Sequence, residues 1–239
     1  MVGLTIGLIV SAAAAGSLVY LQATGRTVTE ATRMQQDATQ AFDVLGRFIR
    51  PTRSVGLVPA SGDSVTFTPV ADYAALDATG IALRADSASL LKVAHPAGPN
   101  GVQTDCLGNG SLSVGTLITT FEWRNNQLFC GNNGINPDQV LLDGVAQWVV
   151  HYGVRAAAPS RDLQYRTFAS EIPWANVESL RVCMVLVSRA PVPEFAEVFR
   201  SSAGLTLPDC QGGDMAPAVR ADDRLRRSYS HVFAIRPGQ

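Results

Sequence analysis

The chain has 239 residues, of which 46% are hydrophobic and 16% are charged, and its formal net charge at pH 7 is −1. This composition is sufficient for a sizeable core and excludes wholesale disorder. It also argues against nucleic-acid binding, which requires a basic patch, because Lys92 is the only lysine and the arginines are scattered. The length suits one ordinary domain with an additional element, or two small domains.

The first 21 residues contain no charged side chain. About 20 apolar residues, at a rise of about 1.5 Å each, cross a hydrocarbon layer of about 30 Å. We therefore predict that residues 1–25 form the hydrophobic, transmembrane half of a helix. The side chains predicted to face lipid or neighbouring helices are Met1, Val2, Leu4, Ile6, Leu8, Ile9, Val10, Leu18, Val19 and Leu21.

A cleaved signal peptide is the main alternative for this segment. The run Ala12–Ala15 offers small residues for a cleavage site, but a signal peptide also needs a basic n-region, and no Lys or Arg precedes Arg26. A buried core helix is a further alternative, although such a helix at the start of a chain ordinarily carries a polar stripe. The helical pattern moreover continues beyond the apolar run, which favours one long helix.

Residues 26–50 have the pattern of an amphipathic helix, with apolar residues mostly at three- and four-residue steps and polar residues on the opposite face. Pro51 ends the pattern, since proline cannot continue a helix interior, and Gly25 and Gly46 are expected to weaken or bend the helix. We predict one helix from Val2 to Arg50, about 70 Å long. The side chains predicted to pack on a sheet are Met34, Ala38, Phe42, Leu45, Phe48 and Ile49.

Residues 51–239 are predicted to form a β-rich globular domain, because short alternating or apolar runs are separated by Gly, Pro, Asn, Asp and Ser clusters. Leu180–Ser188 is apolar on both faces apart from Arg181, which is typical of a central strand. Asn125 and Asn126 predict a hairpin. The other predicted strands are Ser64–Thr68, Ala82–Arg84, Leu90–Ala94, Leu117–Trp123, Gln127–Cys130, Gln147–Val154 and Tyr229–Ile235; Pro191–Pro193, Pro208–Gly213 and Ala216–Pro217 are predicted loops, and Ala221–Arg226 a charged turn.

The predicted fold class is therefore α+β, with one long N-terminal α-helix packed on an antiparallel β-sheet. The apolar face of the second half of the helix needs a partner, and the sheet supplies one.

Four cysteines are present, Cys106, Cys130, Cys183 and Cys210, and none forms a CxxC pair, which disfavours a zinc or thioredoxin-like site. Three pairings are possible, and the sequence-local one, Cys106–Cys130 with Cys183–Cys210, is the simplest. Each such loop of about 25 residues is worth roughly 3 kcal/mol in the chain-entropy model. The alternative is four reduced, buried thiols, but the N-terminal segment favours an oxidising compartment outside the inner membrane.

No motif in the chain predicts catalysis or a cofactor. The histidines His95, His151 and His231 show no metal-binding spacing, and no GxSxG elbow is present. Gly108-Asn109-Gly110 lies between a cysteine and a strand and is predicted to be a turn. The polar residues after Cys130 lack the spacing of a calcium loop. We predict no enzyme activity, no cofactor, no metal and no small-molecule substrate.

The order of the segments resembles type IV pilins, and more specifically the PilW family of minor type IV pilins. The apolar helix that runs into a glutamine-rich amphipathic half is similar to the pilin N-terminus, and the resemblance extends over nearly the whole chain. The segments that carry it are Met1–Val10, Asp105–Gly108 with Leu128–Cys130, Asp143–Val145 with Val150–Val154, Trp174–Val177 with Leu180–Val182 and Leu186–Arg189, and Arg224–Arg227 with Ile235–Arg236.

The resemblance implies a structural subunit held first in the inner membrane by a single helix, with its C-terminal domain in the periplasm, and later incorporated into a pilus. It implies partners among other minor and major pilins, through helix packing and lateral contacts between domains. The implied role is pilus assembly and initiation, which supports adhesion, twitching motility or DNA uptake. The alternatives are a minor pseudopilin of type II secretion and a signal-anchored periplasmic enzyme or binding protein.

The sequence departs from the pilin pattern at its start, because the leader and the first mature residues of that pattern do not precede Met1. Pilins carry a short basic leader that ends in glycine, then a phenylalanine and a glutamate near the mature N-terminus. The counterpart of Met1 is expected just after that glutamate, so leader cleavage and N-methylation are assigned to no residue of this sequence.

Overall fold

A computed structural model describes residues 2–52, 55–59, 65–69, 83–97, 104–109, 115–132, 139–156, 160, 162–168, 172–202 and 204–235. Met1, Ser64, Ala82 and the polar stretch 133–138, for which predictions were made above, lie outside the described residues.

The chain begins with one long helix, α1 (Val2–Ile49), which stops one residue before the predicted end. Pro51 follows at once, and the chain turns there because proline has no N–H to continue the helix. The N–H of Arg50 donates to the carbonyl of Gly46 (3.1 Å), and the Thr52 hydroxyl donates to the carbonyl of Phe48 (3.3 Å). The last turn of α1 therefore keeps partners for its carbonyl groups.

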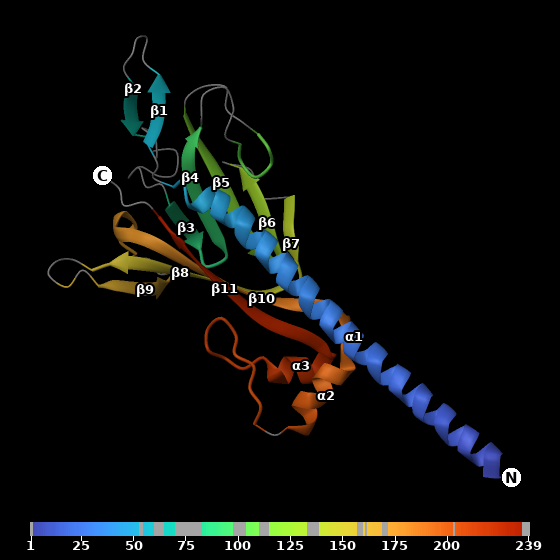
Figure 1. The fold of residues 1–239 in the computed structure, drawn as a ribbon. Helices are drawn as coiled ribbons and strands as arrows, with labels where there is room; N and C mark the ends of the chain where they lie inside the picture. Colours follow the sequence, from blue (N-terminus) through green and yellow to red (C-terminus); the bar gives the residue numbers. More distant parts are fainter. Residues whose placement is uncertain are drawn as a thin grey trace.

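The strands form two larger sheets and a separate hairpin (Figure 1). One sheet has the order β3-β4-β5-β6-β7 and contains β3 (Leu83–Ser87), β4 (Leu90–Ala97), β5 (Gly115–Arg124), β6 (Gln127–Asn132) and β7 (Gln139–Asp143). The other has the order β11-β10-β8-β9 and contains β8 (Val145–Arg155), β9 (Leu163–Thr167), β10 (Val177–Pro191) and β11 (Arg224–Ala234). The hairpin pairs β1 (Val55–Pro59) with β2 (Val65–Pro69). Every pairing between the described strands is antiparallel, which confirms the α+β fold class.

The second half of α1 lies across both larger sheets and joins them. The Phe48 ring lies 6.1 Å from the Phe121 ring of β5, and the Phe42 ring lies 6.3 Å from the Phe233 ring of β11. Gly46 has a role that the sequence did not predict, because a Cβ atom at this position would lie 3.1 Å from the Phe233 ring. The glycine therefore lets the helix approach β11 closely at this point.

Two short helices begin at residues that were predicted to lie in loops, so the loop predictions are wrong at these residues. Pro193 begins α2 (Pro193–Ser201), and Pro217 lies in the first turn of α3 (Ala216–Asp222). Proline is tolerated in the first turn of a helix, where its missing N–H would have no helical partner. The predicted charged turn at 221–226 is also corrected: α3 continues to Asp222, Asp223 adopts the left-handed conformation (φ 58°), and β11 begins at Arg224.

The predicted hairpin and central strand are present. Asn125 (φ 51°) and Asn126 (φ 58°) both adopt positive φ between β5 and β6, as a tight two-residue turn requires. β10 lies between β8 and β11, and a short 3-10 turn, η3 (Trp174–Asn176), leads into it. The single predicted sheet is corrected to two, and β1, β7 and β9 were not predicted, because β7 and β9 are short edge strands without clear alternation.

Candidate interaction site

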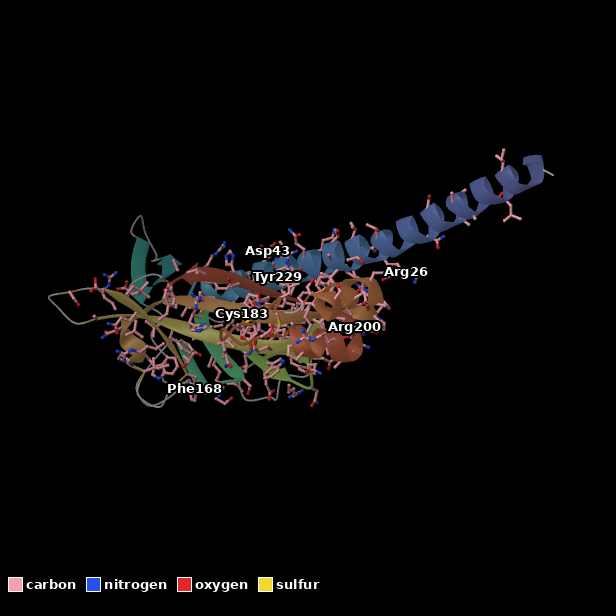
Figure 2. The ribbon with its side chains drawn as sticks, turned by 90° about the horizontal axis from the view of Figure 1, so that it is seen from below. Arg26, Asp43, Phe168, Cys183, Arg200 and Tyr229 are labelled. Carbon is pink, nitrogen blue, oxygen red and sulfur yellow. A yellow bond between two sulfur atoms is a disulfide. The ribbon has the colours of Figure 1, made fainter. Side chains whose placement is uncertain are left out.

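The N-terminal half of α1 projects away from the rest of the protein. Figures 1 and 2 show the helix leaving the domain near Arg26 and continuing toward its N-terminus without another element beside it. Ile6 and Leu8 are 57% and 66% exposed. The hydroxyl groups of Ser11 and Ser17 donate to the carbonyls of Gly7 and Ala13, both at 2.8 Å. These two hydroxyl groups are therefore satisfied within the helix, as an apolar environment requires.

Among the residues that the structure describes, no helix combines the length and the apolar character needed to cross a membrane. The membrane-spanning role of residues 1–25 stays a prediction. Of the side chains named for this half, those of Ile6 and Leu8 are described; the other predicted side chains, Met1, Val2, Leu4, Ile9, Val10, Leu18, Val19 and Leu21, lie outside the described ones.

The second half of α1 buries one face in the core. The helix residues named above for packing on a sheet are all buried: Met34, Ala38, Phe42, Leu45, Phe48 and Ile49. Leu45 and Ile49 are completely inaccessible to solvent. Two of the histidines also pack on this face, with the His95 ring 5.6 Å from Phe48 and the His231 ring 5.5 Å from Phe42. These contacts fix the direction in which the N-terminal half projects.

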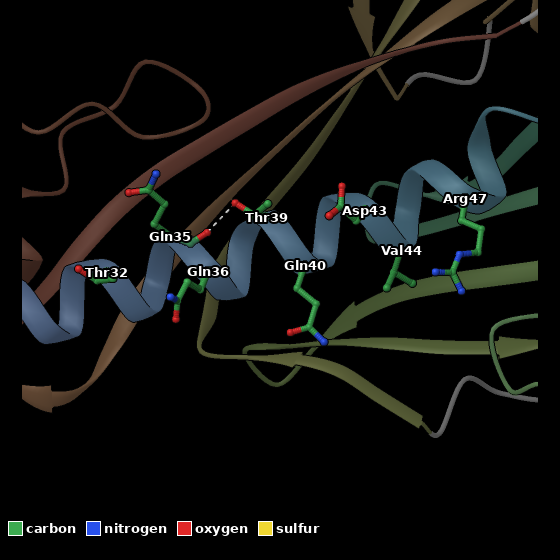
Figure 3. Close-up of a pocket in the computed structure, with 8 residues that line it drawn as sticks. All are labelled: Thr32, Gln35, Gln36, Thr39, Gln40, Asp43, Val44 and Arg47. Carbon is green, nitrogen blue, oxygen red and sulfur yellow. Dashed lines mark hydrogen bonds between the residues drawn. The ribbon is translucent and has the colours of Figure 1, made fainter.

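The opposite face of this half is polar and lines a shallow groove of about 670 Å³. We call it the glutamine stripe, and Figure 3 shows that all of its side chains come from α1: Thr32, Gln35, Gln36, Thr39, Gln40, Asp43, Val44 and Arg47. The Thr39 hydroxyl donates to the Gln35 carbonyl (2.8 Å). Amide groups can donate and accept hydrogen bonds, so the glutamine side chains of the stripe can bond to polar side chains of a neighbouring helix.

The cysteines pair as the local arrangement predicted. Cys106 bonds to Cys130, with their Cα atoms 6.3 Å apart, and Cys183 bonds to Cys210, with their Cα atoms 5.6 Å apart. The first disulfide ties a turn to β6, and Asp105 shapes this turn by accepting hydrogen bonds from two backbone N–H groups, those of Leu107 (2.9 Å) and Asn109 (2.8 Å). The second disulfide ties the segment between α2 and α3 to β10 (Figure 2).

The segment that carries Cys210 is also held by Gln147, a residue that the sequence placed only at the start of a strand. The Gln147 Oε1 atom accepts a hydrogen bond from the Cys210 N–H (3.0 Å), and its Nε2 atom donates to Asp209 Oδ2 (3.4 Å). Asp209 Oδ1 accepts from the N–H groups of Gln211 (2.8 Å) and Gly213 (2.7 Å). Partial burial raises the pKa of Asp209, but these hydrogen bonds outweigh it and hold the pKa below its usual value.

Two further ionisable side chains have pKa values that their surroundings shift. Burial raises the pKa of the Tyr152 hydroxyl, whose ring packs edge-on against Trp174 at 5.0 Å. Burial and the nearby Arg181 guanidinium lower the pKa of His151. Within the described part of the chain, no group of three or more His, Cys, Asp and Glu side chains could hold a metal ion.

No protein-family model matches the chain, and no curated protein matches it. Among solved structures, a type IV-like pilin from Thermus thermophilus is similar to it, with 18% sequence identity and a TM-score of 0.47 over 86% of this chain and 97% of that chain. A TM-score below 0.5 is too low to carry a functional argument. We therefore draw the proposed function from the residues and the architecture of this chain.

Proposed function

We propose that the protein is a structural minor pilin of the PilW type, which takes part in type IV pilus assembly or initiation and so supports adhesion, twitching motility or DNA uptake. The observation that carries the proposal is the division of α1 into two halves. The half beyond Arg26 buries one face on the domain, and the half before it projects with exposed Ile6 and Leu8. An exposed apolar helix of this length needs an apolar environment, which lipid or a bundle of like helices provides.

In the proposed role, the projecting half of α1 and the globular domain make different contacts. The projecting half of α1 is held in the inner membrane before assembly and packs among neighbouring helices in the pilus afterwards. The glutamine stripe and the outer surfaces of the periplasmic domain form lateral contacts with other minor and major pilins. The role is structural and requires no catalysis, cofactor or metal.

The disulfides fit this proposal, because a domain exposed outside the inner membrane folds in an oxidising compartment and cannot rely on cytosolic chaperones. Each disulfide closes a loop between cysteines 24 or 27 positions apart and ties one end of that loop to a strand, β6 or β10. Such covalent ties maintain the shape of exposed surfaces in an extracellular fibre.

The proposal is tested by mass spectrometry of pili sheared from cells that produce the protein. We expect the protein in the pilus fraction at low abundance, and fewer pili when its gene is deleted. Repeated absence from the pili of a piliated strain contradicts the proposal. A secretion defect with normal pili would instead support a pseudopilin of type II secretion, and a monomeric protein that binds a small molecule once the helix is removed would support a periplasmic binding protein or enzyme.

A substitution in α1 tests the role of the projecting half. Leu8→Asp should prevent membrane insertion and assembly, because a charge in the middle of a spanning helix costs about 2.5–3.5 kcal/mol on insertion scales. Val28→Asp is the matched control, since Val28 is similarly exposed (58%) but lies in the half that accompanies the domain. The measurement is the membrane fraction of each variant after cell lysis. Equal membrane association of the Leu8→Asp variant and the unsubstituted protein contradicts a spanning helix.

A further inference from the structure

The loop that carries Cys210 has a defined shape of its own. The N–H of Asp209 donates to the Gly213 carbonyl (2.9 Å), and the N–H of Met215 donates to the Leu207 carbonyl (2.8 Å). The carboxylate of Asp214 accepts from the N–H groups of Leu207 (2.7 Å) and Ala216 (2.9 Å). These bonds close the loop on itself. They do not determine where the loop lies on the sheet.

One covalent and one non-covalent connection join the loop to the sheet. The Cys183–Cys210 disulfide joins the loop to β10, and the Gln147 side chain joins it to β8. Val149 lies opposite Cys183 in the β8–β10 pairing, so Gln147, two residues before Val149, projects from the same face of the sheet as Cys183. Gln147 therefore accepts a hydrogen bond from the backbone N–H of Cys210, the residue with which Cys183 forms its disulfide.

We propose that Gln147 positions Cys210 for pairing with Cys183, and thereby specifies this disulfide. The hydrogen bonds from Gln147 hold the reduced loop near its native position, which brings the Cys210 thiol within reach of Cys183. Loop docking and disulfide formation are thermodynamically linked. Hydrogen bonds that favour the docked loop by a given factor therefore raise the effective concentration of the two thiols by that factor. The inference requires only the folded domain and is independent of the proposed function.

The chemical step is ordinary thiol–disulfide exchange. The thiols of Cys183 and Cys210 pass two electrons and two protons to a low-molecular-weight disulfide such as oxidised glutathione, which leaves as two thiols through a mixed-disulfide intermediate. Both cysteines line a pocket of about 280 Å³ that opens to solvent between the loop and β11. A small disulfide can therefore reach the sulfur atoms while the loop stays in place.

The experiment uses the full chain in detergent micelles, equilibrated in buffers of reduced and oxidised glutathione and then alkylated. Mass spectrometry measures the fraction of each disulfide, and the Cys106–Cys130 bond serves as an internal reference within the same molecule. Gln147→Met keeps the length of the side chain and removes both hydrogen bonds. Gln127→Met is the matched control, because the Gln127 amide of β6 donates to the Asp143 carboxylate of β7 (3.2 Å), in the other sheet.

We expect Gln147→Met to lower the equilibrium constant for the Cys183–Cys210 bond about ten-fold, which corresponds to about 1.4 kcal/mol and lies within the range expected for the loss of its two hydrogen bonds. The constant for Cys106–Cys130 should stay within about two-fold, and Gln127→Met should change neither. A constant for Cys183–Cys210 that stays within two-fold overturns the proposal. An equal fall for both disulfides also overturns it, because that result would show a general loss of stability.

Discussion

The packing of α1 on the sheets can be tested at Leu45, which is completely buried among the apolar side chains that join the helix to the domain. Leu45→Ala removes three carbon atoms from this contact and leaves a cavity, since a helix docked on two sheets cannot collapse into the space. Burial of this kind makes a Leu→Ala substitution cost 2–5 kcal/mol, and we expect about 3 kcal/mol. For a domain of roughly 190 residues this lowers the Tm by about 6–12 °C.

Val44→Ala is the matched control, because Val44 neighbours Leu45 in sequence but is only partly buried and lines the groove of the glutamine stripe. We expect it to cost about 1 kcal/mol or less, since the alanine also favours the helix. The assay is thermal unfolding of the full chain with intact disulfides, followed by near-ultraviolet circular dichroism. Equal effects of the two substitutions, or a loss below about 1 kcal/mol for Leu45→Ala, would refute the proposed packing of α1.

Three further predictions concern the domain. A Cβ atom at Gly153 would lie 2.1 Å from the Ser179 hydroxyl, so Gly153→Ala should lower the free energy of unfolding in urea by about 1–3 kcal/mol. Adding Ser179→Ala should restore much of this loss, and a double variant without any recovery would show that the clash lies elsewhere. Replacing Cys183 and Cys210 together by serine should cost about 3.5 kcal/mol, measured by urea unfolding, because their loop spans 27 positions. The pKa of Asp209 is lowered in the folded state, so its contribution to stability is present above about pH 4 and is lost as the pH falls through the folded-state pKa. The urea midpoint of the Asp209→Asn variant should therefore depend less on pH between about 3 and 6 than that of the unsubstituted protein. An equal pH dependence of the two midpoints would contradict this prediction.

Local patterns in the sequence predicted several elements correctly. The amphipathic period of residues 26–50 predicted the buried face of α1, because a helix places residues three and four apart on one side. The Asn125–Asn126 pair predicted the hairpin between β5 and β6, since both residues tolerate positive φ. The spacing of the cysteines predicted both disulfides, because short loops are the simplest to close.

Other elements were decided by contacts between distant parts of the chain. Pro193 and Pro217 read locally as loop residues, yet each lies in the first turn of a helix that covers part of the four-stranded sheet. β9 is fully exposed along its length and shows no alternation, so its pairing with β8 gives no local signal. The division of the strands into two sheets depends on which strands pair, and these pairings join residues that are distant in sequence.

The sequence by itself determined the long two-part helix, the β-rich domain, the turn and the paired cysteines, because each follows from residue period, turn chemistry or short chain distance. The tertiary structure alone decided that Gly46 admits the Phe233 ring and that Gln147 reaches the loop of Cys210. Both contacts join residues more than 60 positions apart, and their strength depends on distances that are fixed only once the helix and the sheets have packed together.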